Sequence, residues 1–179
     1  MRKVILVGSL IASIAAASPA TAQSLPPDPG TWWTSIGGGV TFPVGSTGDK
    51  LKTGFHGALA VGYQLPDTKI EIGLEGMYLR ADNKLEGGHH SNVFVATAHA
   101  HWGFGGGLYL ATGVGLLRDE YRTPLQDIEI VNTRASFAVE GGLGIDVGKH
   151  VFLEGRVIQT FRKAPNRYTL VPVTIGLRF

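Results

Sequence analysis

Along most of this chain, apolar and polar residues alternate one by one, so every second side chain falls on one face of an extended strand. The last stretch shows this most clearly, because Val171, Val173, Ile175, Leu177 and Phe179 share a face. The same period of two recurs in segments bounded by turn residues, and this pattern predicts an all-β meander of antiparallel strands. The eight predicted strands are residues 32–43, 54–65, 69–79, 92–104, 107–117, 132–147, 151–161 and 170–179.

The connections between these strands alternate in length. Three are tight, at residues 65–69, 104–107 and 147–150. The other four, at residues 44–53, 80–91, 118–131 and 162–167, are longer and more polar. Alternation of side chains alone does not tell which face is inside. Short turns on one rim and long loops on the other are typical of outer-membrane barrels, in which the short turns are periplasmic.

Aromatic residues gather near the strand ends, where a membrane barrel places them at the two lipid–water interfaces. The predicted periplasmic ring is Trp32, Tyr63, Trp102 and Phe179, and the predicted outer ring is Phe42, Phe55, Tyr78, Phe94, Phe161 and Tyr168. A spanning strand needs about 9 to 11 residues, and a closed barrel satisfies all of its backbone groups in lipid. We therefore expect an eight-stranded antiparallel up-and-down transmembrane β-barrel with its apolar face toward lipid.

The residues before the first strand have the features of a secretory signal. Arg2 and Lys3 precede an apolar stretch shorter than the roughly 20 residues of a membrane-spanning helix, and an Ala-x-Ala sequence ends at Ala22. We expect cleavage between Ala22 and Gln23. The predicted organisation is a signal peptide at 1–22, a periplasmic lead-in at 23–31 and a barrel domain at 32–179.

Composition narrows the functional classes. Removing Arg2 and Lys3 from the 16 Lys and Arg residues leaves as many cations as the 14 carboxylates, so the basic pI of about 9.0 does not indicate nucleic-acid binding. The chain has no cysteine, which excludes a domain held together by disulfides.

The ending at residues 174–179 (TIGLRF) and the eight strands give the chain its resemblance to small outer-membrane barrels of the OmpA/OmpX-like superfamily. This resemblance implies that Gly176, Leu177 and Phe179 form the signal recognised by the outer-membrane assembly machinery. It also implies a monomer in the outer membrane of a Gram-negative bacterium, in contact with outer-membrane lipid and lipopolysaccharide.

Charged residues on the polar face are the candidate chemistry. Glu140 and Arg156 lie on strands joined by a tight turn, as diagonal neighbours on one face. A charge in a narrow lumen must be paired, and an eight-stranded barrel holds little besides side chains. We expect a lumen charge network of Glu71, Glu75, His99, Arg134, Glu140, Glu154 and Arg156, packed among small residues. A proton or ion path is the alternative.

His99 and His101 share a face at a spacing that could bind a metal, but the sequence offers no obvious third ligand. We expect interior, hydrogen-bonded histidines, and neither a metal site nor a cofactor.

Catalytic groups are not expected either. Outer-membrane lipid A deacylases of the PagL type use a His and a Ser two residues apart on a late strand, whereas here Gln159 and Phe161 occupy the comparable positions. Residues 86–91 offer an acid, histidines and a hydroxyl in a glycine-rich loop, which rarely holds catalytic geometry.

We therefore expect a non-enzymatic barrel with a plugged polar lumen. Its four outer loops would act on an unknown extracellular ligand or in envelope integrity, since binding variation concentrates in loops on a rigid scaffold. A porin-like channel for small solutes and a lipid A-modifying enzyme remain open.

Overall fold

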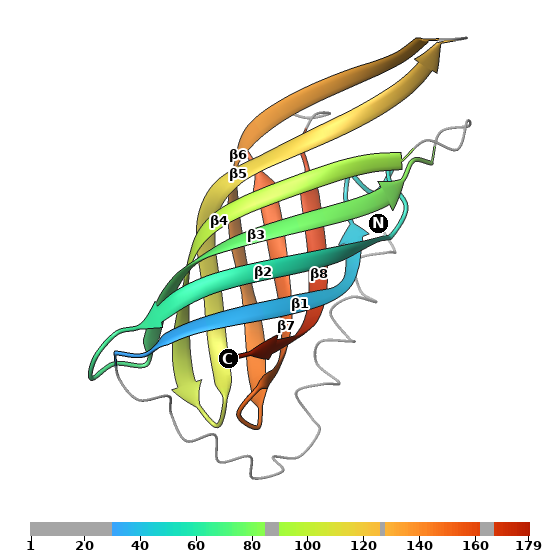
Figure 1. The fold of residues 1–179 in the computed structure, drawn as a ribbon. Coiled ribbons are helices and arrows are strands. Elements are labelled where there is room, and N and C mark those ends of the chain that lie inside the picture. The colour runs from blue at the N-terminus through green and yellow to red at the C-terminus, as the bar shows by residue number, and fades with distance from the viewer. Residues whose placement is uncertain (1–29, 85–89, 126–127, 162–166) are drawn as a thin grey trace.

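All eight predicted segments form strands, and the strands close into one antiparallel barrel in sequence order, as Figure 1 shows. The computed structural model describes residues 30–84, 90–125, 128–161 and 167–179. For residues 121–132 it describes the backbone of the strands but not the side chains. The strands are β1 (Trp32–Pro43), β2 (Gly54–Gln64), β3 (Ile70–Asp82), β4 (His90–Gly105), β5 (Leu108–Leu125), β6 (Ile128–Val147), β7 (Val151–Thr160) and β8 (Thr169–Arg178). The predicted signal peptide lies outside the described residues. Among those described, no helix is long and apolar enough to cross a membrane.

The barrel closes where β1 meets β8. Ile36 pairs with Leu177 and Val40 with Val173. At the end of this pairing, Thr34 N donates to Phe179 O over 3.0 Å, and Phe179 N donates to Thr34 O over 2.8 Å. The last residue of the chain is therefore part of the wall.

The predicted faces are confirmed. Leu59, Leu74 and Ile175 are among the most exposed large apolar residues, while His56 and Arg156 on the alternate positions are buried. The tight turns carry backbone that favours glycine, with φ of +63° at Gly106 and +72° at Gly148.

One predicted loop is wrong. Residues 118–131 were expected to be irregular, but β5 continues to Leu125 and β6 begins at Ile128, with the two paired from Arg118 and Ala135 to Leu125 and Ile128. The described pairing of β6 with β7 starts at Ala138. The hairpin therefore rises beyond the rest of the wall (Figure 1), because cross-strand pairing continues past the point where the barrel face ends.

Candidate functional site

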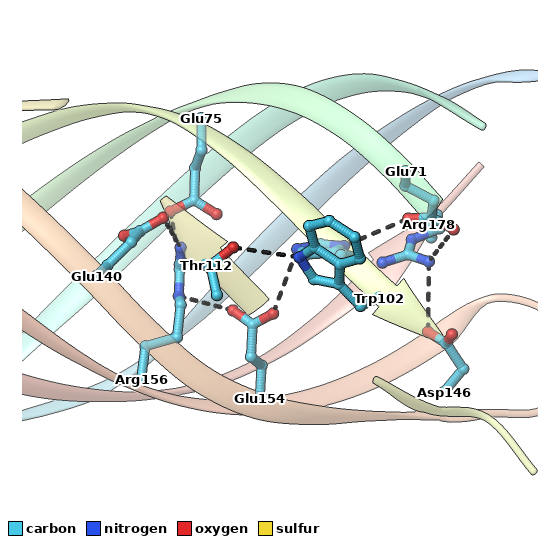
Figure 2. Close-up of polar contacts among 10 residues, drawn as sticks. Glu71, Glu75, Trp102, Thr112, Glu140, Asp146, Glu154, Arg156 and Arg178 are labelled. Carbon is cyan, nitrogen blue, oxygen red and sulfur yellow. Dashed lines mark hydrogen bonds and ion pairs between the residues drawn. The ribbon is translucent and has the colours of Figure 1, made fainter. Parts of the chain in front are cut away.

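The barrel interior contains a charge cluster centred on Arg156, shown in Figure 2. Its Nη2 lies 2.5 Å from Glu75 Oε1, and its Nη1 lies 3.1 Å from Glu140 Oε1. Its Nε lies 2.7 Å from Glu154 Oε1. The Arg156 side chain is 2% exposed, and the carboxylates come from β3, β6 and β7. One guanidinium thus contacts carboxylates from opposite sides of the lumen.

A second cluster is built on Arg178 and lies nearer the tight turns. Its Nη1 is 3.3 Å from Glu71 Oε1 and 3.6 Å from Asp146 Oδ1. His101 connects the two clusters, since its Nδ1 is 3.3 Å from Glu71 Oε2 and its Nε2 is 3.7 Å from Glu154 Oε2. Figure 2 shows the contacts of Arg178 with Glu71 and Asp146.

Aromatic rings surround the lower cluster. Trp33 stacks on His99 and on His101, with ring centroids 5.9 and 6.0 Å apart. The Arg178 guanidinium carbon lies 4.9 Å from the Trp33 ring centroid, a cation–π geometry. Tyr109 also packs on His101, with ring centroids 4.7 Å apart.

Interior glycines make room for these large side chains. A Cβ on Gly62 would overlap the Trp33 ring, and one on Gly144 would overlap the Tyr109 ring. A Cβ on Gly113 would meet the Glu140 carboxylate at 2.5 Å. The small residues of the polar face are therefore the packing complement of the large ones.

The outer half of the interior contains a buried apolar cluster beside buried polar residues such as Asp119, Ser136 and Thr160. The cluster corrects the expectation of a lumen filled by polar side chains alone. The buried cluster consists of Leu51, Ala58, Met77, Leu79, Ala81, Val93, Val95, Leu117, Ala138, Ile158 and Leu170. Apart from Leu51, these residues lie on strands, at the same alternate positions as the interior charges, so the period of two was sufficient to place them inside.

The first outer loop closes over this apolar cluster. Leu51, in the loop between β1 and β2, is 3% exposed and forms a bridge with Asn83 beyond β3. On the other side, Thr47 Oγ1 donates to Arg167 O over 3.1 Å and accepts from Thr169 N over 2.9 Å. The loop is thus held to both β3 and β8.

His56 lies between the two interior zones. Its Nδ1 is 2.9 Å from Thr41 Oγ1 and its Nε2 is 2.9 Å from Thr174 Oγ1. Hydroxyl groups on β1 and β8 therefore hold this ring across the barrel seam.

Five members of the predicted network, Glu71, Glu75, Glu140, Glu154 and Arg156, meet in these clusters. His99 is buried beside them, but neither of its ring nitrogens has a hydrogen-bond partner among the described residues. The expectation that it is hydrogen-bonded is therefore wrong.

Arg134 is a further correction. It is exposed, because it lies on the part of β6 that precedes the described pairing with β7 and so extends beyond the barrel wall. Arg178, His101 and Asp146, which the predicted network omitted, contribute to the lumen clusters at the opposite end of the barrel.

Tyr168 is also not in the outer aromatic ring. Its hydroxyl donates to Asp119 Oδ2 over 3.1 Å, and its ring packs against the interior apolar cluster. It shares the inward alternation of Leu170 and Thr174, which could have placed it correctly.

The remaining chemical candidates are distributed as follows. Of the loop 86–91, residues 86–89 lie outside the described residues, and Ser91 Oγ is buried and donates to Asn83 Oδ1 over 3.0 Å. Within the part of the chain that the structure describes, no three His, Cys, Asp or Glu side chains are arranged to hold a metal ion.

Comparison with known proteins agrees with this architecture. The solved N-terminal barrel of Pseudomonas aeruginosa OprF matches with a TM-score of 0.58 and 16% identity over 82% of this chain and 97% of its own. Yersinia pestis Ail, solved with the heparin analogue sucrose octasulfate, matches with a TM-score of 0.60 and 13% identity over 83% and 99%. Neisserial surface protein A matches with a TM-score of 0.51 and 14% identity over 82% and 95%.

At these identities the solved structures support the fold alone. No curated protein matches the chain in sequence. The family model for the outer membrane protein beta-barrel domain matches residues 8–179. The chain therefore belongs to the outer membrane protein beta-barrel domain family, whose members are located in the outer membrane of Gram-negative bacteria.

Proposed function

We propose that this protein is a non-enzymatic, non-conducting outer-membrane barrel that acts through its extracellular segments, in surface interaction or in envelope integrity. The observation that carries this proposal is the filling of the interior at two successive levels. The charge clusters occupy the periplasmic half, and the apolar cluster under Leu51 occupies the outer half.

Each level opposes conduction for a different reason. The interior of an eight-stranded barrel is just wide enough for side chains, and the paired charges of Arg156 and Arg178 take up that width in the periplasmic half. In the outer half, the apolar side chains of the cluster cannot replace the hydration shell of an ion, which raises the barrier to its passage. A solute would have to displace both the charged side chains and the apolar cluster.

The extracellular side supports a role in surface contact. The paired backbone of β5 and β6 continues past the wall (Figure 1), and this extension supports a role outside the membrane. Loops and hairpins on a rigid scaffold are where binding functions concentrate.

Conductance of the purified protein in planar lipid bilayers tests the proposal. We expect no steady conductance from the unmodified barrel. Leu79→Ala with Leu117→Ala, which removes interior bulk, is expected to permit brief openings. Leu59→Ala with Leu116→Ala removes the same bulk from the lipid face and serves as the control. A large, steady conductance of the unmodified protein would refute the plug and favour a channel.

A further inference from the structure

The outer wall of the barrel has a hollow on the strands β1 to β4. Gly57 faces lipid beside Gly38, and one row nearer the periplasm Gly76 faces lipid beside Ala96. Gly57, Gly76 and Ala96 form the floor of an open groove of about 640 Å³. Its border consists of Ile36, Leu59, Tyr78, Phe94, Leu116 and Arg118. Except for the arginine, the border is apolar or aromatic.

The packing of the barrel does not require glycine at positions 57 and 76. A Cβ on Gly76 would meet nothing within 4 Å, and one on Gly57 would meet only the Gly37 carbonyl at 3.9 Å. This differs from interior Gly62 and Gly144, whose space is filled by aromatic rings. Glycine weakens a strand. Gly57 and Gly76 therefore reduce the stability of their strands, and no interior contact explains why glycine is found there.

The groove ends at a cationic rim. Tyr78, Phe94 and Arg118 lie side by side on β3, β4 and β5, one row below Arg80. Arg80 is exposed, and the Arg118 side chain is 57% exposed with its Nη2 2.8 Å from Glu120 Oε1. These rows lie at the ends of the strands that lead into the long connections, and those connections face the cell exterior in barrels of this class. The rim is therefore at the headgroup level of the outer leaflet.

We propose that this groove is a binding site for lipid A, with one acyl chain on the small-residue floor and a phosphate near Arg118 and Arg80. An acyl chain matches the apolar lining. A phosphate matches the two guanidinium groups, which prefer such oxyanions. Lipid A carries both features and occupies the outer leaflet. The site lies outside the lumen, so it is independent of whether the barrel conducts.

Titration of the full mature chain with lipid A, read by native mass spectrometry from mild detergent, tests this site. We expect a one-to-one complex. Gly76→Leu and Ala96→Leu fill the floor, and each is expected to weaken binding about tenfold. Arg118→Gln is expected to weaken it about fivefold, since a basic residue near a membrane surface contributes about 1 kcal/mol and 1.4 kcal/mol corresponds to tenfold.

Two matched controls are available. Gly155 also faces lipid with open space around an added Cβ, but it lies between Leu143 and Val173. Gly155→Leu therefore adds the same side chain outside the groove and should leave binding unchanged. Lys149→Gln removes an exposed charge from a periplasmic turn and should also have no effect. The shift in gel mobility on boiling confirms that each variant is folded.

Dephosphorylated lipid A and phosphatidylglycerol identify the ligand. Dephosphorylated lipid A should bind about equally to the unmodified protein and to Arg118→Gln, and phosphatidylglycerol should compete poorly. Equal competition by phosphatidylglycerol would overturn the assignment to lipid A. The site itself would be overturned if Gly76→Leu and Gly155→Leu weakened binding equally. It would also be overturned if Gly76→Leu had no effect on binding, or if Arg118→Gln had none.

Discussion

Arg156 is the residue on which the interior charge balance most depends. It contacts three carboxylates and is 2% exposed, so water compensates little for the loss of its charge. Removing one partner from a buried ionic group is costly mainly because it leaves the other charges unpaired and desolvated. The stability of the barrel should therefore respond far more to this arginine than to those at the surface.

Arg156→Ala is expected to lower the free energy of unfolding by about 3 to 5 kcal/mol. Adding Glu140→Gln should recover little, because Glu75 and Glu154 still face each other. Changing all three carboxylates to Gln should recover a large part. Urea unfolding in lipid vesicles, followed by tryptophan fluorescence, measures these changes. Arg118→Ala, at an exposed ion pair, should cost about 0 to 1 kcal/mol. Equal losses for the two arginines would contradict a buried network.

A contact between site residues could be predicted from the sequence when both lie on neighbouring strands. It could not be predicted when the two residues meet across the lumen. Glu140 and Arg156 could be predicted as a pair, because the tight turn between their strands sets the register. The contact of His101 on β4 with Glu154 on β7 could not, since neighbouring-strand register carries no information about contacts across the lumen. Arg134 was misplaced because alternation continues beyond the membrane-spanning part of β6.

Each strand presents alternate side chains to the outer face and to the interior of the barrel. Leu74 on β3 is 63% exposed on the outer face, whereas its neighbour Glu75 contacts Arg156 inside. On a lipid-facing position, a charge costs most at the bilayer midplane and little at the interfaces.

Leu74→Arg is therefore expected to destabilise the barrel by about 2 to 4 kcal/mol in lipid vesicles, as are Val139→Arg and Val157→Arg. Val147→Arg, at the periplasmic end of β6, should cost about 0 to 1 kcal/mol. The same unfolding measurement compares them. A penalty at Val147 as large as that at Leu74 would show that depth in the bilayer does not govern the cost.

At the level of elements, the strand cores were predictable and their outer ends were not. The alternation within β1, β2, β7 and β8 stops near the membrane boundary, so the expected and observed bounds agree closely. In β5 and β6, pairing continues through residues on either side of positions 126–127, a stretch in which charged residues such as Asp119 and Glu120 are mixed with Ile128 and Ile130. This mixed composition led to the prediction of a loop.

For the whole molecule, the decisive feature is closure of the wall by β8. Phe179 is 66% exposed on the lipid face while its backbone pairs with Thr34. Gly176 faces inward, where an added Cβ would overlap the Phe152 ring. The ending TIGLRF therefore has packing constraints of its own, in addition to the assembly role that the family resemblance implies.

Deletion of Phe179 is expected to lower the amount of assembled protein in the outer membrane several-fold, since it removes both the last signal residue and two closing hydrogen bonds. Fractionation, with gel mobility before and after boiling, measures assembly. Phe104→Ser changes an aromatic residue of similar exposure, at 61%, away from the terminus and should have a smaller effect. Unchanged assembly after the deletion would argue against this role of Phe179.

The pairing of β1 with β8 also determines the order in which the molecule can form. The other strand pairs join neighbours in the sequence, whereas the contact between Thr34 and Phe179 spans almost the whole barrel domain. Closing such a long loop has the largest entropic cost, so this contact belongs to the slow, non-local part of folding. Until β8 is in place, one edge of β1 has no partner and can pair with other chains. A chain that is cut short before β8 would thus be an aggregation hazard rather than a partly working barrel.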